Sequence, residues 1–338
     1  MPKTGHLIHP SKVDPYERGK DYPSQDDNLE SFIDNWERYS KRLIMFLGAG
    51  ASIGAINKLG NKLPQAYELR NEIYREFMLR PAQREGFDFQ NLGLMSLEQV
   101  AALAVARCDR TSVEGFVAER FTIERPLWQH AVLSFLRPLA IFTTNYDNLV
   151  ELGWQSHASF GDLKPLVPHF KKTSRLNDNF VPLYKSHGSV QFPHDEVKDG
   201  GLVLTQFDYF EMIPHRKDML DQFTTDFNEY CVVFIGYSFQ DVDLASRLYE
   251  IRKDRRGKNW YAVFPRNNAD VRKMFLEEYK ILQITRTFLD FLVDLDKEVN
   301  FIPDEWKFHN IENLARQGLI YGGDAKLSKM RPSKKKCR

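Results

Sequence analysis

Four short segments of this sequence carry residues whose types and spacing could do chemistry. Each comes directly after a run of apolar residues that is typical of a β-strand. In open α/β sheets, ligands bind at the carboxyl ends of the strands, so we expect all four segments to meet at one crevice. The segments are Gly48-Ala49-Gly50-Ala51-Ser52, Thr143-Thr144-Asn145-Tyr146-Asp147, Lys185-Ser186-His187-Gly188 and Gly236-Tyr237-Ser238.

The first segment is rich in glycine, which lets main-chain amides come close to a ligand. Gly48 and Gly50 could admit a pyrophosphate, and the N-terminus of a following helix would favour its negative charge. The usual dinucleotide fingerprint, G-x-G-x-x-G, is not met because Gly54 comes one residue late, and no Walker A pattern is present. The competing interpretation is a tight turn with no ligand, and the motif alone does not decide between the two.

The other three segments carry the reactive side chains. Asn145 and Asp147 follow a buried strand, where side chains face the crevice, although Asn and Asp are also preferred helix caps. For Asp147 alone, capping is the favoured interpretation. His187 lies in a tight turn before a glycine, at the same edge as the other segments. Ser238 offers a hydroxyl to a ligand, or simply belongs to the turn before a helix that begins near Asp241.

Apolar runs predict the strands that position these segments. An unbroken apolar strand is what a parallel sheet covered on both faces requires. Strands that alternate with helices predict the α/β class, here a Rossmann-like, doubly wound parallel sheet. The predicted strands are residues 43–47, 139–143, 181–184, 202–204, 231–235, 260–264 and 281–284.

The stretch between the first two strands is long and helical, so we expect an inserted helical layer or subdomain over about 64–137. The helices predicted there are 64–80, 97–107, 112–121 and 124–137, and others are expected at 29–39, 147–155, 215–229, 268–280 and 287–299. The expected organisation is a loose N-terminal arm (1–27), a catalytic domain (28–300) and a C-terminal extension with a basic tail (301–338).

Composition excludes several classes of protein. The net charge of +1 over 338 residues gives no overall field that would favour nucleic acid or a membrane as partner. Cys108, Cys231 and Cys337 are far apart and form no CxxC, so we expect neither a disulfide framework nor a metal site. No apolar run approaches the roughly 20 residues of a membrane helix, and the N-terminus lacks the apolar core of a signal peptide. A soluble, cytoplasmic protein is therefore expected.

Taken in order, the four segments resemble those of the sirtuin (SIR2) family. The first matches the family's Gly-Ala-Gly-x-Ser loop, and the second matches its Thr-Gln-Asn-x-Asp segment with Thr144 in place of glutamine. The third and fourth match its His-Gly and Gly-Thr-Ser segments. Asn267 is the candidate for the family's asparagine at the adenosine ribose. The resemblance covers about residues 40–285 and implies NAD as the substrate.

Departures from the family pattern bear on the activity. Deacylase sirtuins carry a zinc ribbon of paired CxxC motifs between the His-Gly and Gly-Thr-Ser segments, whereas residues 189–235 here hold only Cys231. The family's Gly-Ile-Pro-Asp-Phe-Arg segment is replaced by residues 60–64, GNKLP. In these respects the sequence is similar to the bacterial sirtuin-like proteins of antiphage defence. That resemblance implies an NAD⁺ glycohydrolase that depletes the cell's NAD, with no metal.

The resemblance also implies roles for the candidate residues. Nicotinamide leaves readily because it is already cationic, so the protein must place a water on the opposite face of the ribose. Asn145 would orient that water, His187 would accept its proton or bond the ribose hydroxyls, and Asp147 would hold the carboxamide or steady the developing cation. The residues expected to contact the rest of NAD are Gly48, Ala49, Gly50, Ala51, Ser52, Thr144, Gly236, Ser238 and Asn267.

Other interpretations stay open. An NAD-dependent deacylase or ADP-ribosyltransferase would release nicotinamide only with an acylated peptide or acceptor present. A non-catalytic module would hold NAD or ADP-ribose without cleaving it. A vestigial site is disfavoured because Asn145, Asp147 and His187 are all present. A lethal NADase must be kept inactive, so we expect a homo-oligomer or, by analogy with two-component systems, a HerA-type ATPase partner.

Overall fold

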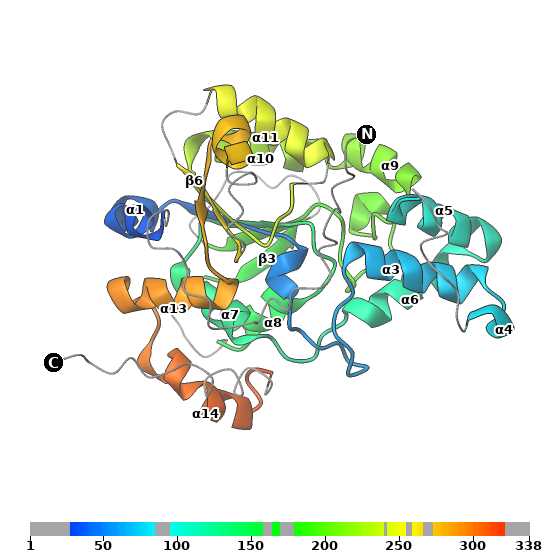
Figure 1. Cartoon of the computed structure of the whole chain (residues 1–338), viewed down its shortest axis with the longest axis horizontal. Helices are drawn as coiled ribbons and strands as arrows, with labels where there is room; N and C mark the ends of the chain where they lie inside the picture. The colour runs from blue at the N-terminus through cyan, green and yellow to red at the C-terminus, as the bar shows by residue number, and fades with distance from the viewer. Residues whose placement is uncertain are drawn as a thin grey trace, which may run out of the picture.

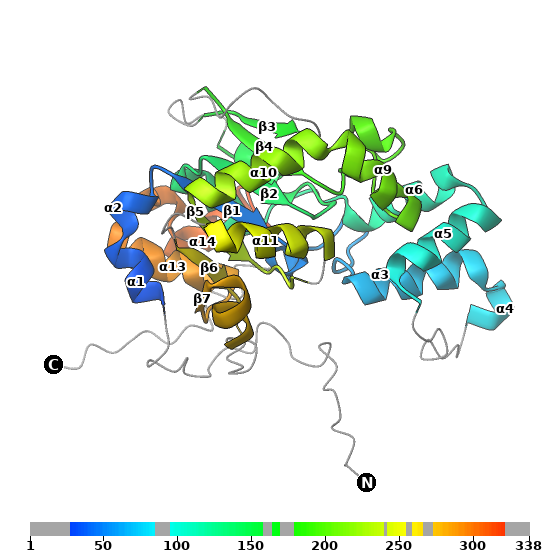
Figure 2. The same cartoon turned by 90° about the horizontal axis from the view of Figure 1, so that it is seen from above.

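The computed structural model describes residues 28–84, 95–157, 164–169, 179–239, 242–254, 259–265 and 273–321. At its centre lies a seven-stranded sheet in the order β3-β4-β2-β1-β5-β6-β7, and every neighbouring pair of strands runs parallel (Figures 1 and 2). The strands are β1 (Leu43–Leu47), β2 (Ala140–Thr143), β3 (Leu166–His169), β4 (Val181–Lys185), β5 (Cys231–Ile235), β6 (Trp260–Val263) and β7 (Ile281–Ile284).

The sheet is buried on both faces, and the side chains of β1 show how. All five residues of β1 are buried. Leu43, Met45 and Leu47 join the apolar core on one face, while Ile44 and Phe46 join a second core on the other. Because successive side chains of a strand point to opposite faces, an unbroken apolar strand supplies both cores at once. The predicted doubly wound α/β fold is therefore confirmed.

Helices cover each face of the sheet. The first core packs beneath α1 (Leu29–Asp34), α2 (Trp36–Tyr39), α7 (Trp128–Ala131), α8 (Leu149–Gln155), α13 (Phe288–Val299) and α14 (Ile311–Arg316). The second core packs beneath α10 (Lys217–Glu229) and α11 (Val242–Asp254).

A helical lobe lies to one side of the sheet (Figure 2). Most of it is inserted between β1 and β2, as predicted, and it has a small apolar core of its own. Ser96 and Asp109 start two of its helices by accepting hydrogen bonds from Gln99 N and Ser112 N. The lobe consists of α3 (Ala66–Ile73), a π-helical turn (Tyr74–Met78), α4 (Pro81–Arg84), α5 (Leu97–Arg107), α6 (Arg110–Phe121) and α9 (Gln206–His215).

Several predicted elements differ from the observed ones. Residues 202–204 form no strand, because their carbonyl and amide groups bond mainly to side chains. The helix predicted over 215–229 is α10, and α9, which ends just before it at His215, was not predicted. The helix predicted from Pro64 begins at Ala66, since Gln65 and Glu68 form a capping box there. The short edge strand β3 was not predicted.

The segment that follows the predicted catalytic domain belongs to the same core. Ile302, Trp306 and Ile311 are buried among the helices of the first face. The indole nitrogen of Trp128 donates to the carbonyl of Trp306 at 2.8 Å. Residues 301–321 therefore complete the cover of the sheet. None of the helices among the described residues is long and apolar enough to cross a membrane.

Candidate functional site

The four chemical segments follow four strands that are neighbours in the middle of the sheet, β4-β2-β1-β5. In the register of the sheet, Lys185, Thr143, Leu47 and Ile235 form one row. Asn145 and His187 each stand two residues beyond that row. The sheet thus brings the predicted segments to one edge, although their order along the chain is different.

The glycine segment packs directly against the fourth segment. Gly48 N donates to the carbonyl of Ile235 at 2.9 Å, and Gly50 N donates to the carbonyl of Gly236 at 2.8 Å. Gly236 has a φ of +61°, and a Cβ on Gly50 would lie 2.7 Å from the Cα of Gly236. Only glycine allows this approach. These two amides, which we expected to face a pyrophosphate, are used to join two loops.

The residues after Gly48 form a short 3-10 turn, Ala49–Ser52, where we expected the start of an α-helix. A turn of four residues lacks the aligned peptide dipoles that make a helix N-terminus attractive to phosphate. Within it, Ala49 is exposed, while Ala51 and Ser52 are buried. The contact of this segment with NAD stays a prediction, and the structure adds that Ser52 of the turn is buried.

Asn145 is partly buried and bridges the second segment to the first. Its Nδ2 donates to the carbonyl of Gly48 at 3.0 Å and to Ser52 Oγ at 2.9 Å. Its main-chain amide donates to Thr143 Oγ1 at 3.0 Å. An Asn side chain has one donor nitrogen and one acceptor oxygen. Since Nδ2 is held by two acceptors, the orientation of Oδ1 is fixed as well.

Asp147 lies behind Asn145 and is only 5% exposed. Its Oδ2 accepts a hydrogen bond from Ser52 Oγ at 2.7 Å, and its Oδ1 accepts one from Leu149 N at 3.1 Å, in the first turn of α8. Burial raises the pKa of the Asp147 carboxyl, while the Lys185 charge and the Ser52 hydrogen bond act against that rise. The bond from Leu149 N to Oδ1 is the kind that the capping interpretation predicts. Oδ2 has a different role, because it bonds the Ser52 hydroxyl that in turn accepts from Asn145 Nδ2.

A buried ion pair lies beside this carboxylate. Lys185, the last residue of β4, is 1% exposed, and its Nζ donates to Glu151 Oε1 at 2.8 Å. The same Nζ donates to the carbonyl of Asp147 at 2.5 Å. These bonds connect Lys185 of the third segment to Asp147 of the second segment and to Glu151 of α8.

His187 is 7% exposed and lies in the turn that follows β4. Ser186 N donates to the carbonyl of Thr143, which anchors the turn to β2. Gly188 has a φ of +85°, as the turn requires. The imidazole packs edge-on against the ring of Tyr209 in α9, with centroids 5.3 Å apart. His187 thus sits between the sheet edge and the helical lobe.

The remaining predicted contacts are placed as follows. Thr144 is partly buried beside Asn145, and Ser238 is exposed in the loop after β5. Tyr237, between Gly236 and Ser238, turns into the core against Phe46, with ring centroids 4.6 Å apart. Asn267 falls outside the described residues.

Sequence reasoning missed Lys185, Glu151 and Arg216 as parts of this region. Lys185 stood within a recognised segment, but nothing local indicated that its ammonium group would be buried. Glu151 and Arg216 carried no signal, because a single charged residue in a helical stretch is usually solvated. Within the part of the chain that the structure describes, no group of three or more His, Cys, Asp or Glu side chains could hold a metal ion.

A cavity of about 290 Å³ lies between the loop of residues 57–62 and the helical lobe. It is lined by polar and charged side chains together with one aromatic ring, and it includes none of the predicted catalytic residues. Its lining residues are Asn57, Asn61, Lys62, Glu72, Arg75, Glu76, Phe116 and Arg120.

Comparison with known proteins gives one family match. Residues 139–284, from the start of β2 to the end of β7, match the model of the SIR2-like domain. Over 232 residues the chain is 28% identical to the NAD(+) hydrolase ThsA of Cytobacillus dafuensis, a match that covers 67% of this chain and 42% of that protein. Over 161 residues it is 27% identical to the ThsA of Acinetobacter baumannii (strain 532279), covering 46% and 32%. The matches thus span less than half the length of these relatives.

Among solved structures, one described as "The Structural basis for Sirtuin Substrate affinity" covers 81% of this chain and 99% of its own, at 11% identity and a TM-score of 0.42. The family model includes the segments that bear Asn145, His187 and Gly236. Residues 139–284 of the chain are therefore similar to the SIR2-like domain.

Proposed function

We propose that this chain is an NAD⁺ hydrolase that cleaves the bond between nicotinamide and ribose, and that it acts in antiphage defence by depleting NAD. The observation that carries the proposal is the hydrogen-bonded edge formed by the loops after β4, β2, β1 and β5, which holds Asn145 and His187 at equal register. The match to the SIR2-like domain and the ThsA relatives supports NAD as the substrate.

In the proposed reaction, the main task of the protein is to position the attacking water against the ribose. Water oxygen attacks C1′ of the ribose, the C1′–N bond breaks, and its electron pair leaves with nicotinamide. The water gives up one proton, so NAD⁺ and water yield ADP-ribose, nicotinamide and H⁺. In this proposal Asn145 Oδ1 accepts a hydrogen bond from the attacking water, and His187 takes its proton. Asp147 acts through Ser52, because its oxygens bond Ser52 and Leu149.

The test is the release of nicotinamide and ADP-ribose from NAD by the purified chain, supplied alone and with candidate activators or partners. Asn145→Ala and His187→Ala are each expected to reduce release by at least a hundredfold, because each removes a group that positions or deprotonates the water. Asn313→Ala and His309→Ala, at exposed positions in the C-terminal segment, are matched controls expected to keep wild-type rates.

Each variant must also unfold at the wild-type temperature, since an unfolded protein would imitate the expected loss. Nicotinamide release that required an acylated peptide would instead indicate a deacylase. Intact NAD recovered after long incubation under all conditions would indicate a binding module. Wild-type rates in folded Asn145→Ala and His187→Ala would show that the site is elsewhere.

A further inference from the structure

Arg216 is a cation enclosed by the protein at the junction of α9 and α10. It is 0% exposed, and burial lowers the pKa of its guanidinium to about 10, so it stays charged at neutral pH. A buried charge is costly to keep unless hydrogen bonds satisfy it. The partners of this cation therefore indicate what it does.

Five hydrogen bonds of the guanidinium go to main-chain carbonyls. Nη1 donates to Lys185 O at 3.3 Å and to Ser186 O, while Nη2 donates to Val197 O at 2.7 Å and to Gly201 O at 3.0 Å. Nε donates to Val197 O at 3.2 Å. Five contacts match the five N–H groups of a planar fork. The end of β4 and the loop of residues 197–201 are thereby fixed to one rigid group.

This arrangement fixes the peptide units on both sides of His187. The carbonyl of Ser186, which Arg216 bonds, belongs to the peptide that leads into His187. The carbonyl of His187 accepts from Val203 N at 3.0 Å, and Ser189 N donates to the carbonyl of Gly200 at 3.1 Å. Arg216 holds the first peptide directly and the second through the neighbouring loop.

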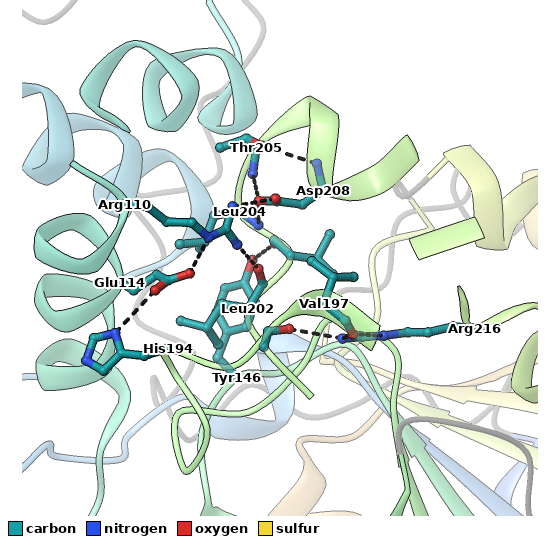
Figure 3. A network of polar contacts seen from close by, with 12 residues as sticks. Arg110, Glu114, Tyr146, His194, Val197, Leu202, Leu204, Thr205, Asp208 and Arg216 are labelled. Carbon is teal, nitrogen blue, oxygen red and sulfur yellow. Dashed lines mark hydrogen bonds and ion pairs between the residues drawn. The ribbon is translucent and has the colours of Figure 1, made fainter. Parts of the chain in front are cut away.

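The carbonyls of residues 201–203, at the end of that loop and just after it, are bonded by three different parts of the fold (Figure 3). Gly201 O accepts from Arg216, Leu202 O from Arg110 of α6 at 3.2 Å, and Val203 O from the hydroxyl of Tyr146 at 2.6 Å. The guanidinium of Arg110 also donates to the carboxylates of Glu114 in α6 and Asp208 in α9. Arg216 bonds both the loop and the turn before His187, so it sets their relative position.

We propose that Arg216 is a positioning residue for His187 in the hydrolysis proposed above, on which this inference rests. It touches no reacting atom. Its five bonds fix the main chain around His187, and the Tyr209 ring packs against the imidazole that the main chain places. A merely structural role would lower stability and leave kcat of the folded protein unchanged.

The kinetic test uses the full chain with Arg216→Lys and Arg216→Ala. Lysine keeps the charge but has one nitrogen, which cannot span four carbonyls. We expect kcat for nicotinamide release to fall by about a hundredfold, as displacement of a catalytic group by about 1 Å does, and KM to change by less than about threefold. Methylguanidinium at millimolar concentration should restore part of kcat in Arg216→Ala. Arg70→Ala, which removes a bond to the carbonyl of Met95 in the helical lobe, is the control and should keep wild-type kcat.

A second measurement is independent of activity. The ring signals of His187 in an NMR spectrum, assigned by comparison with His187→Asn, should shift in folded Arg216→Lys and stay in place in Arg70→Ala. If the wild-type chain releases no nicotinamide, the proposed function fails, while the His187 signals still decide the positioning role. Wild-type kcat or unshifted His187 signals in folded Arg216→Lys would overturn the inference. Unfolding of both variants that methylguanidinium does not reverse would overturn it too, because the role would then be structural.

Discussion

Asn145 depends on a chain of hydrogen bonds that runs back into the protein. Asp147 Oδ2 accepts from Ser52 Oγ, and Ser52 Oγ accepts from Asn145 Nδ2. The hydroxyl of Ser52 can serve both neighbours because it is one donor and two acceptors. Asp147 Oδ2 accepts the proton of the Ser52 hydroxyl at 2.7 Å, which leaves the lone pairs of Ser52 Oγ for Asn145 Nδ2. Ser52 therefore determines which way the amide of Asn145 faces.

Ser52→Ala should lower kcat for nicotinamide release by about tenfold with little change in KM. The variant removes one acceptor from Asn145 Nδ2 and leaves a buried Asp147 oxygen without its donor, a loss on the order of 1.4 kcal/mol. Steady-state kinetics with NAD measures the effect. Ser134→Ala, at a fully buried serine that bonds the carbonyl of Ala131, is the matched control. A kcat within twofold of wild type would exclude a positioning role for Ser52.

At the scale of elements, the sequence predicted what depends on local pattern. β1 and β5 were predicted with their observed bounds because each is an unbroken apolar run of strand length that ends at a glycine-containing segment. β3 escaped prediction because it is a half-exposed edge strand that includes Pro168. A strand was wrongly predicted at 202–204, where apolar side chains pack into the helical lobe while the main chain is held by Arg110 and Tyr146.

For the candidate site, too, the sequence predicted positions that follow from local pattern and missed the contacts between distant residues. Asn145 and His187 were found because each directly follows a predicted strand, and parallel strands bring their ends to one edge. The contact partners could not be found, since the bonds from Asn145 to Gly48 and from Arg216 to Ser186 join residues 97 and 30 positions apart. No local pattern specifies such pairs. That the glycines admit a ligand stays a prediction, and the close approach of Gly50 to Gly236 is a further role that the sequence did not indicate.

Two buried histidines beneath the sheet make stability depend on pH. Burial lowers the pKa of His130 in α7 to about 3 and that of His157 after α8 to about 4. In the unfolded chain both titrate near 6.5, so between about pH 6.5 and 4 the unfolded state binds more protons. Their contribution to stability is fully present above pH 6.5 and falls as the pH falls, by up to about 1.4 kcal/mol per histidine for each pH unit.

Urea unfolding of the wild type should therefore show a lower free energy of unfolding at pH 5.0 than at pH 7.5, and the variant with His130→Gln and His157→Gln should show a smaller decrease. Asp226 in α10, whose pKa is raised by burial to about 7, contributes in the opposite direction but equally in both proteins. His309→Gln, at an exposed position, should behave as the wild type. An equal decrease in the double variant would mean that other groups carry the pH dependence.

At the scale of the whole molecule, the described C-terminal residues and the sheet share one apolar core. The first core contains side chains from α1, near the start of the described chain, and from α14, near its end. Trp306 connects the C-terminal residues to the central part of the chain. Its ring centroid lies 3.9 Å from that of His157, and its carbonyl accepts a hydrogen bond from the indole nitrogen of Trp128. Apolar burial is the main favourable term in folding, so removing any layer of this core should weaken the whole.

The variant Trp306→Ala tests whether residues 301–321 and the sheet unfold together. Trp306 is 3% exposed, and truncation of a buried tryptophan costs about 3–5 kcal/mol, a large part of the roughly 5–15 kcal/mol that stabilises a typical domain. We expect the urea midpoint to fall sharply while unfolding stays a single transition by circular dichroism and by fluorescence. Phe207→Ala, which truncates an aromatic side chain that is 60% exposed, should change the free energy of unfolding by less than about 0.5 kcal/mol. An unchanged midpoint, or a separate early transition in Trp306→Ala, would show instead that residues 301–321 are an appendage and that the sheet folds without them.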